Sequence, residues 1–419
     1  MARIASRFAR LESRRLARDA VAGLMSGLAV KNCWTLAEHA GHDSPDGLQH
    51  LLRKAKWDTD GVRDDLRRYV VERLGTVDTM LVVVETGDLK KGAHAVGVQR
   101  QYTGTAGRIE NAQVAVYLTY ASADGHALID RELYLPRVWA DDTDRREQAG
   151  VPATVKFATK PALATEMITR ALDAGVTARW VAGDEVYGAD PKLRKTLEDR
   201  GVGYALAVAC SHPVRTGVGK IRADALAASL LSKAWQRLSA GNGSKGPRFY
   251  DWTWISIEPE PGAVPSGGRG QRWLLVRRNN ATGELACYRC WSRAPVPLCE
   301  LVCVAGRRWT IEESFQASKT LTGLDQHQVR RWTSWHRWTI LAMLAYALLA
   351  VLTATERAET PTPRGLIALT CNEIHRLFNT LIVEPIRDLR HRLHWSTRRR
   401  RHQHRARISH YQRREAFLA

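Results

Sequence analysis

The sequence predicts a mixed α/β protein with a helical domain before the sheet and a basic helical segment after it. Three observations lead to this prediction: helical periodicity up to about residue 75, alternating strands and helices from Met80 onward, and an arginine surplus in residues 387–419. The chain has 419 residues, 44% of them hydrophobic, so it is long enough for several domains and for a sizeable core.

Residues 1–76 are predicted to form a helical domain. Four segments with a period near 3.6 residues are separated by Gly, Asp or Pro: Arg3 to Ala22, Trp34 to Ala40, Gly47 to Lys56 and Gly61 to Leu74. The second and third segments resemble a helix-turn-helix pair, in which Gln49, Arg53 and Lys54 would lie on the DNA-contacting helix. Small helical bundles give the same pattern, so a purely structural role is the alternative.

Residues 77–211 are predicted to begin the sheet. The predicted strands are 81–84, 113–121, 127–135, 178–182 and 203–209, and the predicted helices are 160–174 and 190–200. Three strands followed by alternating helices and strands are typical of a mixed α/β sheet.

Residues 212–304 are predicted to form a β-rich insertion, because turn residues separate β-branched and aromatic runs. The predicted strands are 248–257, 272–278, 285–291 and 298–304. Four cysteines in this segment suggest a zinc site: Cys287, Cys290, Cys299 and Cys303. Residues three apart on a strand face opposite ways, so we favour cysteines that bind no metal. The odd total of seven cysteines is typical of a reducing cytoplasm.

Helices are predicted again over residues 305–356. The apolar run Thr339 to Ala354 is shorter than the roughly 20 residues that cross a bilayer, so it predicts a buried helix and no membrane association. The N-terminus also lacks the apolar region of a signal peptide. We therefore expect a protein of the bacterial cytoplasm.

Residues 357–419 are predicted to form a basic segment that contacts DNA. The net charge of the chain is +20, and residues 387–419 contain eleven arginines but only two acids. At its centre lie Arg398, Arg399, Arg400 and Arg401, interleaved with histidines and aromatic residues. This pattern favours phosphate contacts; a solvated tail and a membrane-surface patch are the alternatives.

A charged stripe on one predicted helix is the first candidate for an active site. Arg308 and Glu312 are four residues apart and Lys319 follows seven later, so they would share a face. A carboxylate between two cations suits a divalent metal held against a phosphodiester, although a solvated face with ion pairs is the alternative. Asp184 is the second candidate, because it ends a predicted strand at the edge where catalytic groups often project.

Six ordered segments resemble the DDE transposases of bacterial insertion sequences, in the group with a Y-R-E-K signature. They are ETGDLKKG (85–92), VGVQRQYTGTAGRIENAQVAVYL (96–118), DRELYLP (130–136), FATKP (157–161), GDEVYG (183–188) and RWTIEESFQASK (308–319). This resemblance implies an RNase H-like core in which three carboxylates hold two Mg²⁺ or Mn²⁺ ions. It makes Asp184 the second carboxylate and Glu312 the third, and makes Arg308 and Lys319 contacts to the end of the element. We also expect Lys90 and Lys91 to contact DNA phosphates.

Two positions depart from the family pattern. The tyrosine expected three residues before Arg308 is Ala305. The first catalytic aspartate, expected before E-T-G, is Val84, which cannot bind a metal. Glu85 is a possible substitute, but consecutive strand residues point to opposite faces, so it would need a bulge or a frayed strand end.

The resemblance implies a transposase that binds terminal inverted repeats, cleaves DNA and transfers strands, with chemistry impaired by Val84. The implied partners are double-stranded DNA at the repeats and the target, and a second copy of the chain in a synaptic homodimer. The alternatives are an inactive relative that holds or blocks element ends, and a general RNase H-like nuclease.

Overall fold

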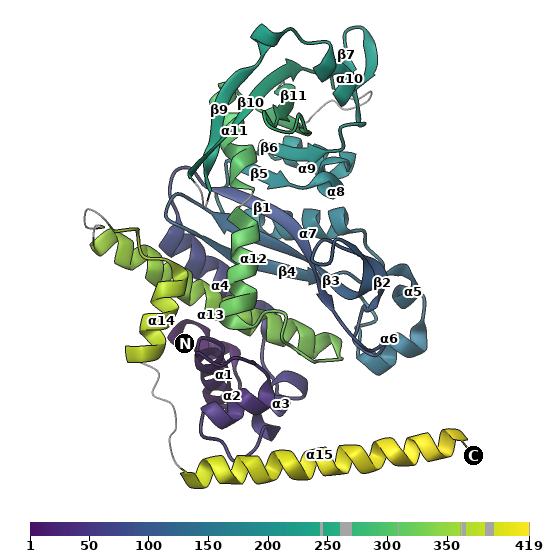
Figure 1. The fold of residues 1–419 in the computed structure, drawn as a ribbon, viewed down its shortest axis with the longest axis vertical. Coiled ribbons are helices and arrows are strands. Elements are labelled where there is room, and N and C mark those ends of the chain that lie inside the picture. The colour runs from purple at the N-terminus through teal and green to yellow at the C-terminus, as the bar shows by residue number, and fades with distance from the viewer. Residues whose placement is uncertain are drawn as a thin grey trace.

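The computed structural model shows a mixed α/β protein built on one large sheet (Figure 1). It describes residues 1–419 except 244–245, 260–269, 309, 361, 363–365, 382–388 and 419. Within the described residues, the sheet contains the strands β1 (Met80–Leu89), β2 (Gln99–Thr103), β3 (Arg108–Ala121), β4 (His126–Leu133), β5 (Trp180–Gly183), β6 (Gly203–Val208), β9 (Gln236–Gly243), β10 (Gly246–Ser256), β11 (Gln271–Arg278) and β12 (Leu285–Ser292).

The strand order is β2-β3-β1-β5-β6-β12-β11-β10-β9, and β4 pairs with β3. The central strands β1, β5 and β6 are parallel to one another, whereas the other pairs are antiparallel. The segment predicted as a β-rich insertion therefore continues the core sheet, because β12 pairs with β6. A separate hairpin is formed by β7 (Pro213–Thr216) and β8 (Gly219–Arg222).

The N-terminal helices are η1 (Ala2–Arg7), α1 (Leu11–Leu24), α2 (Cys33–His39), α3 (Asp46–Arg53) and α4 (Thr59–Leu74). Helices at all four predicted segments are confirmed, but the first segment is broken into η1 and α1 at extended Phe8. Asn32 starts α2 with a capping box, because its side chain accepts from the Thr35 amide and the Thr35 hydroxyl accepts from the Asn32 amide.

The remaining helices lie around the sheet. They are α5 (Arg137–Ala140), α6 (Thr143–Ala149), α7 (Lys160–Asp173), α8 (Glu185–Gly188), α9 (Pro191–Asp199), α10 (Ala223–Ala228), η2 (Ser232–Ala234), α11 (Leu298–Arg307), α12 (Thr310–Thr322), α13 (Trp332–Glu359), α14 (Cys371–Leu381) and α15 (Leu389–Leu418). In Figure 1, α12 crosses the sheet in front of β1 and β4, and α15 extends beneath α2 and α3.

The predicted buried helix is confirmed in α13. Among the described residues, α13 is the one helix long and apolar enough to cross a membrane, but 78% of its most apolar window is buried inside the protein. Its Arg337 donates to the carbonyls of Leu51, Leu52 and Ala55, which satisfies the C-terminal end of α3. The core helix thereby holds the N-terminal domain against the sheet.

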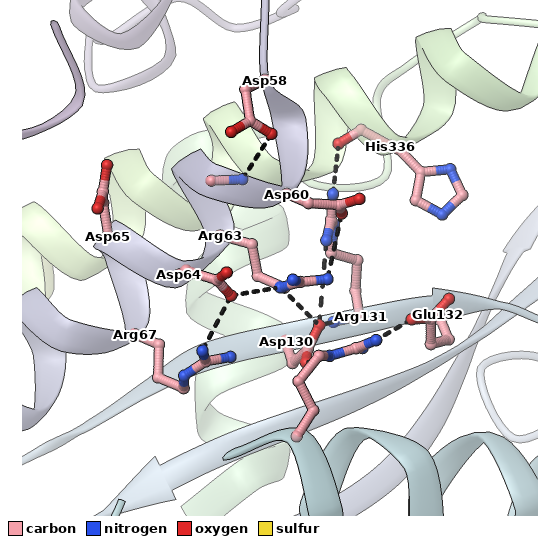
Figure 2. A network of polar contacts seen from close by, with 12 residues as sticks. Asp58, Asp60, Arg63, Asp64, Asp65, Arg67, Asp130, Arg131, Glu132 and His336 are labelled. Atoms are coloured by element: carbon pink, nitrogen blue, oxygen red, sulfur yellow. Dashed lines mark hydrogen bonds and ion pairs between the residues drawn. The ribbon is translucent and has the colours of Figure 1, made fainter. Parts of the chain in front are cut away.

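A buried ionic network joins α4, β4, α7 and α13 (Figure 2). Asp130 on β4 is fully buried and accepts a hydrogen bond of 2.9 Å from Arg170 of α7. Arg63 of α4 and Arg131 each approach the same carboxylate at 4.0 Å. Arg131 also donates to the carbonyl of His336 at 3.3 Å. Asp130 is thus the anionic group that these arginines share at the junction of the helical domain and the sheet.

One predicted strand is wrong. Residues 298–304 form the first part of helix α11, which begins after Pro297. Leu298, Leu301, Val302 and Ala305 are buried at helical spacing, and the short apolar run concealed this period. Cys299 and Cys303 therefore lie exposed on a helix, whereas Cys287 and Cys290 lie buried on β12.

Candidate active site

Asp184 lies where β5 ends and α8 begins. All four residues of β5 are buried, and the Asp184 side chain caps α8 by accepting from the Val186 amide at 3.0 Å. Burial raises the pKa of Asp184 to about 6; the charge of Glu85 adds to this effect, and Arg308 and Lys160 oppose it. Asp184 is therefore a partly desolvated carboxylate at the end of a central parallel strand.

Position 84 lies beside Asp184. The parallel pairing of β1 with β5 ends at Val83 and Gly183, so Val84 and Asp184 are the next residues on the two strands. Adjacent strands are roughly 4.8 Å apart, and residues in register share a face of the sheet. An apolar, partly buried side chain therefore occupies the place where the family resemblance expects an aspartate.

Glu85 follows Val84 on β1, and its charge is close enough to Asp184 to raise the pKa of that carboxyl. Glu85 forms an ion pair with Lys160 of α7 and accepts a hydrogen bond of 3.4 Å from the hydroxyl of Tyr187. The next residue, Thr86, accepts from Lys319 of α12 at 2.9 Å. The pairing of β1 with β3 runs without a register shift from Met80 to Leu89, so no bulge turns Glu85 toward α12.

Helix α12 presents Glu312, Phe315 and Lys319 toward the face that carries Val84. The ring of Phe315 packs edge-on against Tyr117, with centroids 5.2 Å apart, and Tyr117 is the β3 neighbour of Val84. Glu312 lies about one turn before Phe315 and is exposed, while Lys319 lies one turn after it. The contacts of Phe315 and Lys319 thus place this part of α12 over β3 and the second half of β1.

Arg308 is not on the same helix as Glu312 and Lys319, which corrects the sequence prediction. It forms the C-cap of α11, and α12 begins at Thr310. The sequence did not indicate that α11 ends here, because the spacing from Arg308 to Glu312 and Lys319 is the same as within one helix. Arg308 is still close enough to lower the pKa of Asp184, so it remains part of the same site.

The residues present do not complete a three-carboxylate metal site. Within the described part of the chain, no three His, Cys, Asp or Glu side chains lie close enough together to hold an ion. Asp184 and Glu312 supply two carboxylates, and Val84 supplies no donor. Glu85, the alternative donor, is paired with Lys160, and its charge reaches Asp184 and raises the pKa of that carboxyl.

A second charged cluster, which the sequence analysis missed, lies on the α12 face of β1. The side chain of Asp88 is 10% exposed; it accepts from His327 Nε2 at 3.0 Å and lies 3.9 Å from Lys319. Burial raises the pKa of Asp88, but His327, Lys90 and Lys319 outweigh it and leave that pKa below its usual value. Because Lys319 contacts both Thr86 and Asp88, its charge is partly neutralised within the protein.

The proposed DNA contacts differ in exposure. Gln49 and Arg53 of α3 and the C-cap residue Lys54 are exposed, whereas Leu48, Leu51 and Leu52 of α3 are buried. Lys91 is exposed as well. Lys90 instead turns into the protein: its ammonium donates to the His327 carbonyl at 3.0 Å, and burial lowers its pKa.

The four central arginines of α15 divide into two pairs. Arg398 lies 3.3 Å from Asp46, and Arg399 lies 2.5 Å from Glu38. Arg400 and Arg401 are exposed. The first pair is therefore engaged with the N-terminal domain, and the second pair faces solvent.

Residues 3–225 match the family model described as DDE superfamily endonuclease. This match covers more than half of the chain, so the chain belongs to the DDE superfamily endonucleases.

The chain is also 31% identical over 195 residues to the protein named "Probable transposase for insertion sequence element IS701" from Microchaete diplosiphon. That match covers 46% of this chain and 48% of the relative, so it spans about half the length of each. Among solved structures, a piggyBac transposase synaptic complex with hairpin DNA aligns with 92% of this chain and 75% of the solved chain. The sequence identity there is 11% and the TM-score is 0.44.

Proposed function

We propose that this protein is an insertion-sequence transposase that binds terminal inverted repeats but is impaired in DNA cleavage and strand transfer. Val84 beside Asp184 is the observation that carries this proposal. The family membership and the similarity to a transposase support the class of activity.

The proposed catalytic arrangement is RNase H-like. Asp184 at the end of β5 and Glu312 on α12 act as two carboxylates on the same side of the sheet, and Arg308 and Lys319 contact the DNA end. Divalent ions, Mg²⁺ or Mn²⁺, serve this class of nuclease by activating the attacking oxygen and stabilising the leaving oxygen. Because a charged donor is missing at position 84, we expect weak metal binding and slow cleavage.

The proposed partners are double-stranded DNA at the terminal repeats and the target, and a second copy of the chain in the synaptic complex. The exposed polar face of α3 and the exposed arginines of α15 support DNA contact. We place the reaction on the bacterial nucleoid in the cytoplasm.

Cleavage of labelled DNA that carries the element's own terminal repeats tests the proposal. The chain is compared with Val84→Asp in Mg²⁺ and in Mn²⁺, and with the double variant Val84→Asp/Asp184→Asn as the matched control. We expect cleavage by the Val84→Asp variant to exceed that of the unmodified chain by orders of magnitude. The double variant should be as inactive as a no-enzyme reaction.

Two other outcomes would change the conclusion. Equal, metal-dependent cleavage by the unmodified chain and Val84→Asp would show that another group completes the site, and the role assigned to position 84 would be wrong. Repeat-specific binding without cleavage by either protein would favour an inactive relative that holds or blocks element ends. That second candidate has one observation in its favour, namely that the Glu85 carboxylate is already paired with Lys160.

A further inference from the structure

The arginine-rich helix α15 is fixed to the N-terminal domain by a buried tryptophan. Trp395 is fully buried, and its indole N–H donates to the carbonyl of His42 at 2.9 Å. Its ring packs edge-on against Trp34 of α2, with centroids 5.8 Å apart. The connection between α2 and α3 thus provides a socket for this side chain, although the two segments are about 350 residues apart in sequence.

Polar contacts surround the socket and come from the same face of α15. His391 contacts the carbonyl of Glu38 at 2.9 Å, and His394 contacts that of Asp43 at 3.0 Å. Together with Trp395, these residues recur at intervals of three and four, so they form one stripe of the helix. The ion pairs of Arg398 and Arg399 with Asp46 and Glu38 extend this stripe.

Docking in this way places exposed arginines beside the predicted DNA-contacting helix. A groove of about 360 Å³ lies between α3 and α15, and its lining includes Gln49, Arg398, Arg401 and Arg405. Arg401 and Arg405 are exposed and one helical turn apart. Figure 1 shows α15 lying along the bottom of the N-terminal helices and extending beyond them.

We propose that α3 and α15 form one composite surface for a single DNA duplex, with Trp395 as the residue that positions the two helices. Gln49 would face base edges, while Arg401 and Arg405 contact phosphates of the same duplex. The groove is polar and cationic, which matches the charge of a nucleic acid backbone. This inference rests on the proposed function, because it concerns how the same DNA is held.

The test measures DNA affinity of the full-length chain over a series of KCl concentrations. The probes are a labelled duplex with the terminal repeat and a scrambled duplex of equal length. Trp395→Ala is compared with Leu393→Ala, which removes an exposed apolar side chain from the same helix. Hydrogen exchange of the α15 amides reports whether the helix has left its socket.

We expect Trp395→Ala to release α15 and to weaken repeat binding at least about tenfold, although the variant removes no charge. Its plot of log affinity against log salt should be flatter by about one to two units, as expected when phosphate contacts are lost. Leu393→Ala should bind like the unmodified chain. The exposed double variant Arg401→Gln/Arg405→Gln should flatten the plot by a similar amount without releasing α15.

Two results would overturn the inference. The first is release of α15 by Trp395→Ala with unchanged affinity and salt dependence. The second is an unchanged salt dependence in Arg401→Gln/Arg405→Gln. If the unmodified chain binds neither duplex, the proposed function itself is wrong. This outcome is distinct from failure of the composite surface, in which the unmodified chain still binds DNA.

Discussion

Introducing an aspartate at position 84 should destabilise the protein without metal and make it responsive to Mg²⁺. Val84 and Asp184 occupy adjacent positions on neighbouring parallel strands, so two carboxylates there would lie roughly 5–6 Å apart. At an effective dielectric constant near 20, their repulsion is about 3 kcal/mol. Both positions are partly exposed, so solvent screening reduces the expected loss to about 1–3 kcal/mol.

Urea unfolding at pH 7.5 measures this effect. In EDTA, Val84→Asp should have a lower free energy of unfolding than Val84→Asn, which has nearly the same shape but no charge. Added Mg²⁺ should restore stability only in the aspartate variant, by about 2.7 kcal/mol at a concentration 100 times its dissociation constant. Equal stability of the two variants in EDTA, or an equal response to Mg²⁺, would refute the placement of position 84 beside Asp184.

Three further predictions concern the core and its ionic groups. Burial and Arg357 lower the pKa of His126 to about 4, so His126 binds a proton more readily in the unfolded chain. The stability that neutral His126 contributes should therefore be lost as pH falls from about 6.5 to 4, by at most about 3 kcal/mol. In urea titrations at each pH, His126→Gln should remove this contribution and leave that of buried His336, whose pKa burial lowers to about 3. Phe315→Ala should cost about 3–4 kcal/mol because its buried ring packs on Tyr117; a loss below about 1 kcal/mol would contradict the packing of α12 on the sheet. Asp130→Asn should cost about 3–5 kcal/mol because it leaves buried arginines without their shared carboxylate. The exposed Asp60→Asn should cost less than about 1 kcal/mol in the same thermal or urea assay.

Local patterns in the sequence were sufficient for most of the helices and strands. The helices of the N-terminal domain and the strand that carries position 84 follow from hydrophobic periodicity, which depends on neighbouring residues alone. The run from Leu298 to Val304 is an exception, because a short apolar segment does not distinguish a strand from a buried helix. The break at Arg308 was also concealed, since the spacing to Glu312 and Lys319 continues as if the helix were unbroken.

The parts that could not be predicted depend on contacts between distant segments. The sequence indicated that Glu85 would face away from position 84, but the ion pair with Lys160 requires knowing where α7 lies. The buried position of Trp395 was likewise hidden within a charged segment, although its spacing from His391 and Arg398 marks one helical stripe. Charge alone suggested an arm that contacts phosphates, and it did not indicate that part of this arm docks on the N-terminal domain as a helix.

The continuous pairing between β6 and β12 has a consequence for anyone who wishes to shorten this protein. Five residue pairs, from Val208 with Cys287 to Tyr204 with Trp291, join the core strands to the segment that precedes α11. Excision of residues 212–304 would leave without partners those backbone amides and carbonyls of β6 that face β12, while the pairing of β6 with β5 would remain. Such an uncovered sheet margin is a template for intermolecular strand addition, so a minimal version of the protein would be prone to aggregate.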